Sequence, residues 1–272
     1  MVTNLRDVVE YAHSLWPLSG AESWDAPGLV SGSLESPVKR ILLAVDAVAE
    51  TVEQAVEVEA DLLITHHPLL MRGVTSVNEE LYKGNLIAQL IRGNVALLAA
   101  HTNADVVENG VSDVIAQSLG LIDTAPIEPG VVPGTGIGRV GNLPEVTTLG
   151  ALARALADLL PNTAGGVKVS GEFTAAISRV ALCGGAGDSL LATDAVRGAD
   201  VYITSDLRHH PAQEAREQAL ISGGPALIDV SHWASEWLWL DTAAAQLQKQ
   251  FPDIDVEVSD LRTDPWDFLV VQ

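Results

Sequence analysis

The sequence is poor in cysteine and in aromatic residues, and it has no long apolar run. Its single cysteine, Cys183, excludes a disulfide within the chain and fits a reducing cytoplasm. Aromatic residues are only 4% of the 272 residues while hydrophobic residues are 47%, which predicts a core of Ala, Val, Leu and Ile. No apolar stretch approaches the roughly 20 residues of a membrane span, and the amphipathic N-terminus is not typical of a secretory signal. We therefore expect a cytoplasmic protein with no membrane partner.

Positive charge is also scarce. The chain has 15 Lys and Arg residues against 36 Asp and Glu residues, which gives a net charge of −21. A protein that binds nucleic acid needs a basic face, so this balance argues against a nucleic-acid partner. A small anionic substrate would need a local source of positive charge, and bound metal ions are one such source.

Strand and helix patterns alternate along the chain, which predicts an α/β fold with mixed or parallel sheets flanked by helices. The expected strands are 38–45, 62–65, 95–100, 167–169, 180–182, 201–204, 226–230 and 254–258. The expected helices are 4–16, 51–60, 85–92, 111–119, 149–160, 188–197, 211–220 and 232–250. Thr51 with Gln54 indicates a capping box at the start of the second helix.

Residues 123–144 interrupt this alternation with four prolines and five glycines, which is typical of a connector between domains. We predict two similar α/β lobes. The first comprises residues 1–124 and 226–272 and binds metal, and the second comprises residues 125–225. Residues 60–65 resemble residues 199–204, and a His-His-Pro sequence follows each, which suggests related halves; a chance match between two buried strands is the alternative.

Two adjacent histidines, His66 and His67, follow the strand pattern of residues 62–65. Loops at strand ends are where α/β proteins place their chemistry, and Pro68 keeps His67 out of the helical region. Neighbouring residues on one strand can reach two different points, so the pair suits two metal ions better than one. The alternative is a pair of surface histidines that bond to water or to carbonyl groups.

Two further segments follow buried strands in the same way. One holds His101 and Asp105, and the other holds His232 and Glu236. The four-residue spacing of His232 and Glu236 places both side chains on one helix face, where they can grip one ion or one each of two. Alone, each segment also fits a polar helix face or a capped turn. Together with the histidine pair they predict a site for two divalent ions, of Zn, Fe, Mn, Co or Ni.

Two divalent ions would outweigh the two carboxylates and make the pocket cationic, so it would favour a small anionic or polarised substrate. A pair of metals can bind a bridging water, lower its pKa and stabilise a developing oxyanion. The sequence therefore predicts a dinuclear divalent-metal-dependent hydrolase that uses a metal-bound hydroxide. The alternative is a protein that binds metal without turnover, in a structural, metal-trafficking or partner-recruiting role.

Several different short motifs are distributed along the chain between residue 22 and residue 265. They are Glu22-Ser23-Trp24-Asp25 with Gly28-Leu29, Ile64-Thr65-His66-His67-Pro68, His101-Thr102-Asn103 with Asp105, Gly136-Ile137-Gly138-Arg139, Gly184-Gly185-Ala186-Gly187, Thr204-Ser205-Asp206 before His209-His210, His232 with Glu236, and Thr263-Asp264-Pro265. In this combination the chain resembles the NIF-three-like family of dinuclear-metal-centre proteins, known as GTP cyclohydrolase I type 2 homologues.

The resemblance implies five metal ligands, which are His66, His67, Asp105, His232 and Glu236. It implies that Glu236 bridges the two ions, with His66 and Asp105 on one and with His67 and His232 on the other. It also implies two similar α/β lobes and a ring-shaped homohexamer whose sites face an internal cavity. The family name suggests a nucleotide substrate, GTP, with opening of the purine's imidazole ring.

The chain departs from the family at Thr204-Ser205-Asp206, where relatives often have Thr-Gly-Glu or Thr-Gly-Asp, and this predicts a different loop near the site. Other residues have open roles. His101 could orient a ligand, donate a proton or only cap a strand end. His209 and His210 could contact the substrate. Cys183 lies within an apolar strand pattern, which argues against a catalytic thiol.

Overall fold

The computed structural model describes residues 3–271, and the chain forms two compact units. Unit 1 comprises Met1–Ala104 and Leu240–Thr263, and unit 2 comprises Asp105–Trp239 and Asp264–Gln272. Each unit has its own main sheet. The chain therefore begins unit 1, builds most of unit 2, and then returns to add the last strand of unit 1.

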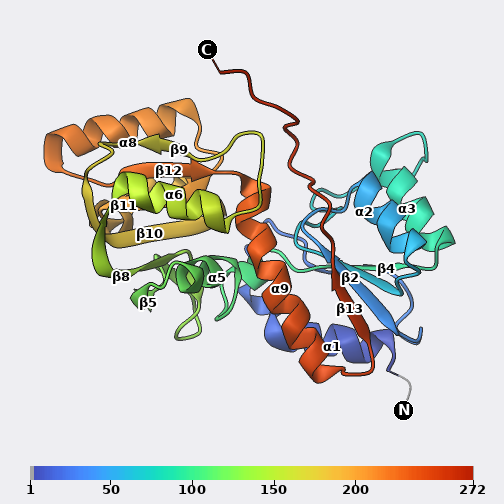
Figure 1. Ribbon diagram of the computed structural model, residues 1–272. Helices are drawn as coiled ribbons and strands as arrows, with labels where there is room; N and C mark the ends of the chain where they lie inside the picture. Colours follow the sequence, from blue (N-terminus) through green and yellow to red (C-terminus); the bar gives the residue numbers. More distant parts are fainter. Residues whose placement is uncertain (1–2, 272) are drawn as a thin grey trace. The chain divides into compact units, whose positions relative to one another are not determined.

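The sheet of unit 1 has the strand order β1-β4-β3-β2-β13 (Figure 1). The strands are β1 Gly28–Ser31, β2 Arg40–Ala44, β3 Leu62–Thr65, β4 Ala96–Ala99 and β13 Asp255–Val258. Strands β4, β3, β2 and β13 run parallel, and only β1 is antiparallel to its neighbour. Because the three central strands are parallel, the loops that follow β2, β3 and β4 all leave from one edge of this sheet.

Helices cover both faces of this sheet (Figure 1). Helices α2 Ala49–Glu57 and α3 Tyr82–Arg92 pack on one face, where Leu42, Leu63 and Leu97 of three neighbouring strands meet Val52 and Leu90. Helix α1, Leu5–Leu15, lies on the other face and is capped by Asn4, whose side chain accepts from the Asp7 amide. Both strand faces are apolar because both are covered, as is usual for parallel sheets.

The main sheet of unit 2 has the order β5-β8-β10-β11-β12-β9. The strands are β5 Ile122–Ala125, β8 Arg139–Thr148, β9 Lys168–Ser170, β10 Ala176–Ala186, β11 Val201–Ser205 and β12 Ala226–Val230. Strands β10, β11 and β12 run parallel, and the outer pairs are antiparallel. A small separate sheet pairs β6 Glu128–Pro129 with β7 Gly136–Ile137.

The helices of unit 2 follow its strands, as in unit 1. They are α5 Val111–Ser118, α6 Leu149–Leu159, α7 Asp194–Arg197 and α8 His209–Ser222, with a short 3-10 helix η2 at Asp188–Ala192. On one face of the sheet, Ala181, Tyr202 and Leu227 pack with Leu190 and Val196. Helices α4 Thr102–Asp105 and α9 His232–Gln250 each begin in one unit and end in the other, and a further 3-10 helix, η1, spans Leu18–Gly20.

The predicted fold class is confirmed, but the predicted lobe boundaries differ from the observed units. Strand β12 pairs in parallel with β11 and so belongs to the second sheet, although residues 226–272 were expected in the first lobe. Residues 105–124 also belong to unit 2. The expected connector at 123–144 contains β5 to β7 and the first half of β8. A hydrophobic run predicts a buried strand, but it does not show which sheet the strand joins.

The similar sequences at residues 60–65 and 199–204 form the same local structure in the two units. Asp61 Oδ2 accepts from the backbone amides of Lys39 and Arg40, and Asp200 Oδ2 accepts from those of Ser178 and Arg179. Each aspartate precedes the central parallel strand of its sheet, β3 or β11, and ties it to the strand before it. In both units, therefore, an aspartate before the strand bonds to backbone amides of the preceding strand, and the two units share this contact as well as the sequence pattern.

Replacing Asp200 with alanine should lower the free energy of unfolding by about 1 kcal/mol near pH 7. Partial burial raises the pKa of Asp200, but the bonds from Arg179 and Ser178 outweigh it and hold the pKa below the usual range. A lowered folded-state pKa stabilises the protein above the normal aspartate pKa, and this contribution is lost as the pH falls through the folded value. Urea titrations should show the variant's deficit constant above about pH 5 and shrinking below about pH 4. Asp158→Ala, on the exposed face of α6, should show no such deficit.

A buried ion pair holds β8 to α5 in unit 2. Arg139 is 2% exposed, and its Nε donates to Asp113 Oδ1 at 3.0 Å. Three more of its N–H groups donate to the backbone carbonyls of Gly136, Gly138 and Val107 at 2.7–2.9 Å. Asp113 also accepts from the Asn109 amide and from the Gln117 side chain. A charge buried this deeply is tolerated because both members of the pair make several hydrogen bonds.

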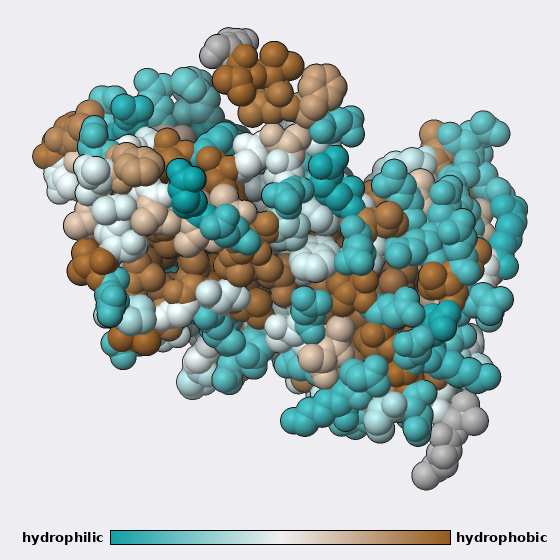
Figure 2. All heavy atoms as spheres, in the orientation of Figure 1, coloured by the Kyte–Doolittle hydropathy of each residue, from teal (hydrophilic) through white to brown (hydrophobic). Residues whose placement is uncertain are grey.

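The C-terminal segment after Asp264 forms no helix or strand within the described residues. Its large hydrophobic side chains are exposed: Trp266, Phe268, Leu269, Val270 and Val271 are 65–85% exposed. In Figure 2 hydrophobic side chains of this segment lie beside the grey terminus. The segment therefore adds little to the core. Across residues 3–271, no helix combines the length and the apolar character needed to cross a membrane.

Candidate metal centre

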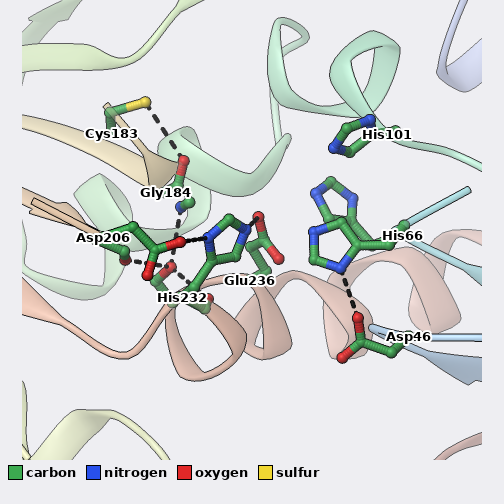
Figure 3. A network of polar contacts seen from close by, with 12 residues as sticks. Asp46, His66, His101, Cys183, Gly184, Asp206, His232 and Glu236 are labelled. Carbon is green, nitrogen blue, oxygen red and sulfur yellow. Dashed lines mark hydrogen bonds and ion pairs between the residues drawn. The ribbon is translucent and has the colours of Figure 1, made fainter. Parts of the chain in front are cut away.

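His66 and His67 lie at the carboxyl end of β3, on the edge of the unit 1 sheet where parallel strands open into loops (Figure 3). The β3 strand is held on both sides, because Thr65 is paired with Ala44 of β2 and with Ala99 of β4. Backbone bonds from the amides of His66 and His67 to Ala44 and Val45 extend this support past the strand end. The two rings are thus carried on a rigid stem, with centroids 5.1 Å apart.

Each of these rings is oriented through its Nδ1 atom. His66 Nδ1 donates to the carbonyl oxygen of Ala100 at 2.8 Å. His67 Nδ1 donates to Asp46 Oδ1 at 2.7 Å, the bond drawn as a dashed line at Asp46 in Figure 3. Asp46 is itself held by a hydrogen bond from the Thr263 hydroxyl. A neutral imidazole that donates from Nδ1 carries its lone pair on Nε2, which is the form that binds metal ions.

His101 leaves the neighbouring strand, β4, and its ring meets both rings of the histidine pair, with centroid distances of 5.1 and 5.3 Å. Its Nδ1 contacts Asp25 Oδ1 at 2.8 Å. Among the described residues, His66, His67 and His101 form a group whose candidate ligand atoms all lie within 4.8 Å of one another. His101, whose motif fits three different roles, thus lies directly beside the histidine pair.

Burial, with a smaller contribution from the neighbouring His66, lowers the pKa of His101 to about 4, although its bond to Asp25 opposes this. His101 is therefore neutral near pH 7 and keeps its one ring proton on Nδ1, where it bonds to Asp25. Burial tends to raise the pKa of Asp25, but hydrogen bonds from Thr102 and His101 outweigh it and the pKa falls below its usual range. The pair is thus a neutral imidazole held by a charged carboxylate.

In unit 2, helix α9 begins directly after β12 and carries His232 and Glu236 on its first turns. Ser231 caps the helix by accepting from the Ala234 amide, and Asp264 holds the Ser231 hydroxyl at 2.6 Å. His232 Nε2 and Glu236 Oε1 are 2.8 Å apart, as the four-residue spacing predicts. Glu236 is 3% exposed, so its carboxylate is buried rather than on a solvated helix face.

Asp206 orients His232 as Asp46 orients His67. Its Oδ2 lies 2.8 Å from His232 Nδ1, and this bond, ahead of the opposing effect of burial, holds the pKa of Asp206 below its usual range (Figure 3). Asp206 has a φ of 55°, a left-handed conformation that aspartate tolerates at some cost. Relatives often have glycine at the position of Ser205, the residue before Asp206. The left-handed conformation is therefore at Asp206 and not at the position where relatives have glycine.

The glycine-rich end of β10 is built against these two side chains. Gly185 has a φ of 69°, and a Cβ at this position would lie 2.6 Å from Glu236 Oε1 and 3.3 Å from His232 Nε2. Its amide donates to Ser235 Oγ at 3.0 Å, and its carbonyl accepts from Thr204 at 3.1 Å. Gly185 therefore leaves room at the carboxylate that any side chain would fill.

The remaining predicted residues are less tightly placed. Asp105 is the last residue of α4 and belongs to unit 2, so the five predicted ligands divide between the units instead of lying in one lobe. His209 and His210 are exposed on the first turn of α8, and no potential metal group among the described residues includes them. Cys183 is buried, and burial raises the pKa of its thiol to about 12, unlike the lowered pKa of an activated thiol.

The residues present fit the predicted divalent ions. The imidazoles of His66, His67, His101 and His232 are each fixed at Nδ1 by a carbonyl or a carboxylate, the arrangement typical of metal-binding histidines. Beside His232, the missing Cβ of Gly185 keeps space at a buried carboxylate. Imidazole and carboxylate donors together suit zinc, iron, cobalt, nickel or manganese.

Three supporting carboxylates were not predicted: Asp25 and Asp206 were noted only as motif residues, and Asp46 was not noted at all. Asp46 had a usable signal, because it follows the strand pattern of residues 38–45 directly, as His66 and His101 follow theirs. Asp25 lies far from His101 in sequence and has no signal of this kind. Thr263 and Asp264 are likewise motif residues whose support roles appear only in the structure.

Comparison with known proteins gives the same family for the whole chain. The sequence profile described as Duf34/NIF3 (NGG1p interacting factor 3) matches residues 3–265. The protein named GTP cyclohydrolase 1 type 2 homolog in Streptomyces coelicolor is 44% identical over 269 residues, which cover 96% of this chain and 93% of the relative. The protein of that name in Mycobacterium leprae is 32% identical over 374 aligned residues, covering 98% and 96%.

The fold of this chain also resembles that of a solved structure. A hypothetical protein from Staphylococcus aureus superposes with a TM-score of 0.88 at 28% identity, and the match covers 99% of this chain and 100% of that one. The strand-exit histidines and the His-x-x-x-Glu helix described above lie within the matched residues. The chain belongs to the Duf34/NIF3 family.

Proposed function

We propose that this protein is a divalent-metal-dependent hydrolase whose ligands are His66, His67, Asp105, His232 and Glu236, holding two ions per chain. The observation that carries the proposal is the fixing of each histidine's Nδ1 by a carboxylate or a carbonyl. An imidazole held in this way presents the lone pair of Nε2 in a fixed direction, and this requires a specific hydrogen-bond partner for each ring. Surface histidines that merely bond to water need no such partner.

Two divalent ions, when bound, supply Lewis acidity that activates water and stabilises a developing negative charge. The chain's own residues do the positioning. Asp46 and Asp206 hold the imidazoles of His67 and His232, and Glu236 is the proposed bridging carboxylate. Gly185 keeps the space at Glu236 open.

The substrate class we propose is a small anion, because a cationic centre in a chain of net charge −21 attracts negative charge locally. GTP, with opening of its imidazole ring, is the first compound to test, since the curated relatives carry a GTP cyclohydrolase name. His209 and His210 remain proposed substrate contacts. A cytoplasmic location, which the composition suggests, and a homohexamer, which the family resemblance implies, are part of the same proposal.

The metal requirement is tested with a matched pair of variants on helix α9. Glu236→Gln keeps the shape of the side chain and removes its charge, while Asp241→Asn makes the same change at an exposed position. We expect about two equivalents of transition metal per chain in wild type and in Asp241→Asn, and at most half of this in Glu236→Gln, by elemental mass spectrometry. Turnover of GTP or of generic phosphoesters should require added metal and should fall at least about 100-fold in Glu236→Gln.

Wild-type protein that stays without metal after loading with zinc, manganese and iron would disprove the proposal. Stoichiometric metal with no turnover of any substrate would favour the non-catalytic role, in which the metal stabilises the fold or recruits a partner.

A further inference from the structure

Residues 266–271, here called the apolar tail, expose five large hydrophobic side chains in a run that only Asp267 interrupts. The five side chains are 65–85% exposed. Aromatic residues make up only 4% of the chain, yet the tail places Trp266 and Phe268 two positions apart on its surface. Monomeric proteins rarely expose so continuous an apolar stretch, and such a stretch usually marks a contact with another molecule.

The backbone of the apolar tail is as accessible as its side chains. Within the described part of the chain, residues 267–271 make no hydrogen bond and no ion pair. The start of the tail is nevertheless fixed, because Asp264 accepts from the Ser231 hydroxyl at 2.6 Å and from the Trp266 amide at 3.3 Å. The tail therefore leaves unit 2 from a fixed point and presents both its side chains and its backbone to a partner.

Helix α8 of the same unit is only loosely packed. None of its 14 residues is buried, and Ala212 and Ala215 pack only in part against the core of unit 2. A groove of about 380 Å³, here called the α8 groove, lies between α8 and the residues of η2 and α7. Helices in proteins owe most of their stability to an apolar face that packs against other elements. One copy of the chain therefore covers α8 incompletely.

The lining of the α8 groove suits an apolar segment. Both walls contribute small or apolar side chains, which are Leu191, Ala192, Pro211, Ala215, Ala219 and Pro225. Leu220 and Ile221 of α8, next to the groove residue Ser222, are 77% and 81% exposed and extend the apolar surface. Burial of the tail here would remove apolar area from water on both sides of the contact.

The charges of the groove favour an occupant with a negative charge on the α7 side. Asp188 is paired with Arg208 at 2.6 Å, whereas the exposed guanidinium of Arg197 has no carboxylate partner within the described residues. Glu214 lies on the opposite, α8 wall. Asp267, the single charge of the apolar tail, therefore complements Arg197 only if it faces the α7 wall.

A second groove of unit 2 is a poorer match for the tail. It lies between β8 and α6 and is lined by Leu143, Leu152 and Leu159, but its only charged residue is Glu145. A tail that carries Asp267 would be repelled there. Charge therefore selects the α8 groove, although both grooves are largely apolar.

The tail and the α8 groove are separate surfaces within one copy. No residue of the tail lines the groove, and the tail keeps its high exposure. Each copy therefore presents a donor segment and an acceptor groove at the same time. When two such surfaces differ, their contact is heterologous, and its repetition closes a ring or extends a filament.

We infer that the apolar tail of one copy docks in the α8 groove of a second copy, with Phe268 among the apolar walls and Asp267 facing Arg197. The inference rests on the self-association in the proposed function, but on neither metal binding nor hydrolysis. It assigns a binding role to two surfaces outside the metal centre.

Crosslinking of the full chain tests which surfaces meet. One copy carries Phe268→Cys, and a co-expressed copy carries Ala192→Cys at an exposed position of the groove lining. The native Cys183 is buried, so a short bismaleimide should join the new thiols and give covalent dimers in a denaturing gel. In the control, Val131→Cys replaces Phe268→Cys at a fully exposed position between β6 and β7 and should give no dimers.

Sedimentation equilibrium measures the strength of the contact. Phe268→Asp should raise the dissociation constant of the assembly at least about 30-fold, the effect of losing a central aromatic anchor. Val131→Asp makes a similar change outside the contact and should leave the constant unchanged. Arg197→Glu and Asp267→Lys should each weaken association about 10-fold, and the two changes together should restore most of it, because the charges are exchanged.

The thermal midpoint of each variant shows whether it folds. A folded Phe268→Asp protein that associates as wild type does, or no crosslink between the Phe268→Cys and Ala192→Cys copies, would overturn the inference. A chain that carries both cysteines and crosslinks only within itself would overturn it as well, because the tail would then occupy its own groove. Monomeric wild type would overturn both the inference and the proposed homohexamer, whereas metal content and turnover would still decide the hydrolase.

Discussion

Replacing Arg139 with methionine is expected to lower the free energy of unfolding by about 3–5 kcal/mol, the usual cost of leaving one member of a buried ion pair alone. The guanidinium donates to Asp113 and to three backbone carbonyls, so its loss leaves a charged carboxylate and three acceptors under-bonded in the core of unit 2. Urea titration followed by circular dichroism gives the free energy directly.

Two comparisons make this result specific. The exposed pair of Arg92 with Glu79 has good two-point geometry, yet Arg92→Met should leave the unfolding midpoint almost unchanged, because water replaces the lost partner. The double variant Arg139→Met with Asp113→Leu should regain part of the loss, since no buried charge remains. An Arg139→Met protein as stable as wild type would mean that Asp113 reaches water in solution.

Gly185→Ala should weaken metal binding by about 100-fold, because the new methyl group would overlap the Glu236 carboxylate and crowd His232 Nε2. Hydrogen bonds to Ser235 and Thr204 hold the backbone of Gly185 in place. We therefore expect the Glu236 carboxylate to move away from the new methyl group. Competition with a chromophoric chelator would measure the affinity. An unchanged affinity would show that Glu236 does not need its present position to bind metal.

Gly120 provides a matched control for this substitution. It has the same φ of 69°, at the C-terminal end of α5, and a Cβ there would meet nothing within 4 Å. Gly120→Ala therefore carries the backbone cost of a left-handed alanine, about 1–2 kcal/mol, without the clash. Both variants should lose similar stability from this cause, and only Gly185→Ala should lose metal affinity.

The sequence predicts the buried parallel strands best, because their hydrophobic runs have clear ends. Strands 62–65 and 226–230 match β3 and β12, and helix 232–250 matches α9. The capping box predicted to start at Thr51 is misplaced, because helix α2 starts at Ala49. Thr51 lies within the first turn, where its hydroxyl accepts a hydrogen bond from the Val48 amide. The signal there was real, but its position depended on a hydrogen bond that spacing alone does not fix.

Residues 123–144 show why the other strands were missed. Strand β5 is exposed along its whole length, and β6 and β7 have two residues each, so neither has an apolar run to recognise. At the site, the histidines stand out because the chain has only seven, whereas Asp25 and Asp46 are two among 36 acidic residues. Rare residues can be selected by position in the sequence, while common ones are selected only by what they contact.

The return of the chain to unit 1 has a consequence for its synthesis. Strand β13 pairs with β2, so Asp255 meets Arg40 only after more than 200 intervening residues have left the ribosome. Until then the emerging N-terminal part carries an unpaired edge at β2, which is a template for wrong pairing with other chains. Residues 105–239 of unit 2, by contrast, are contiguous and can fold as they emerge. Nascent chains stalled before residue 255 should therefore depend on chaperones that cover this edge, and slow closure of β13 should limit the folding rate.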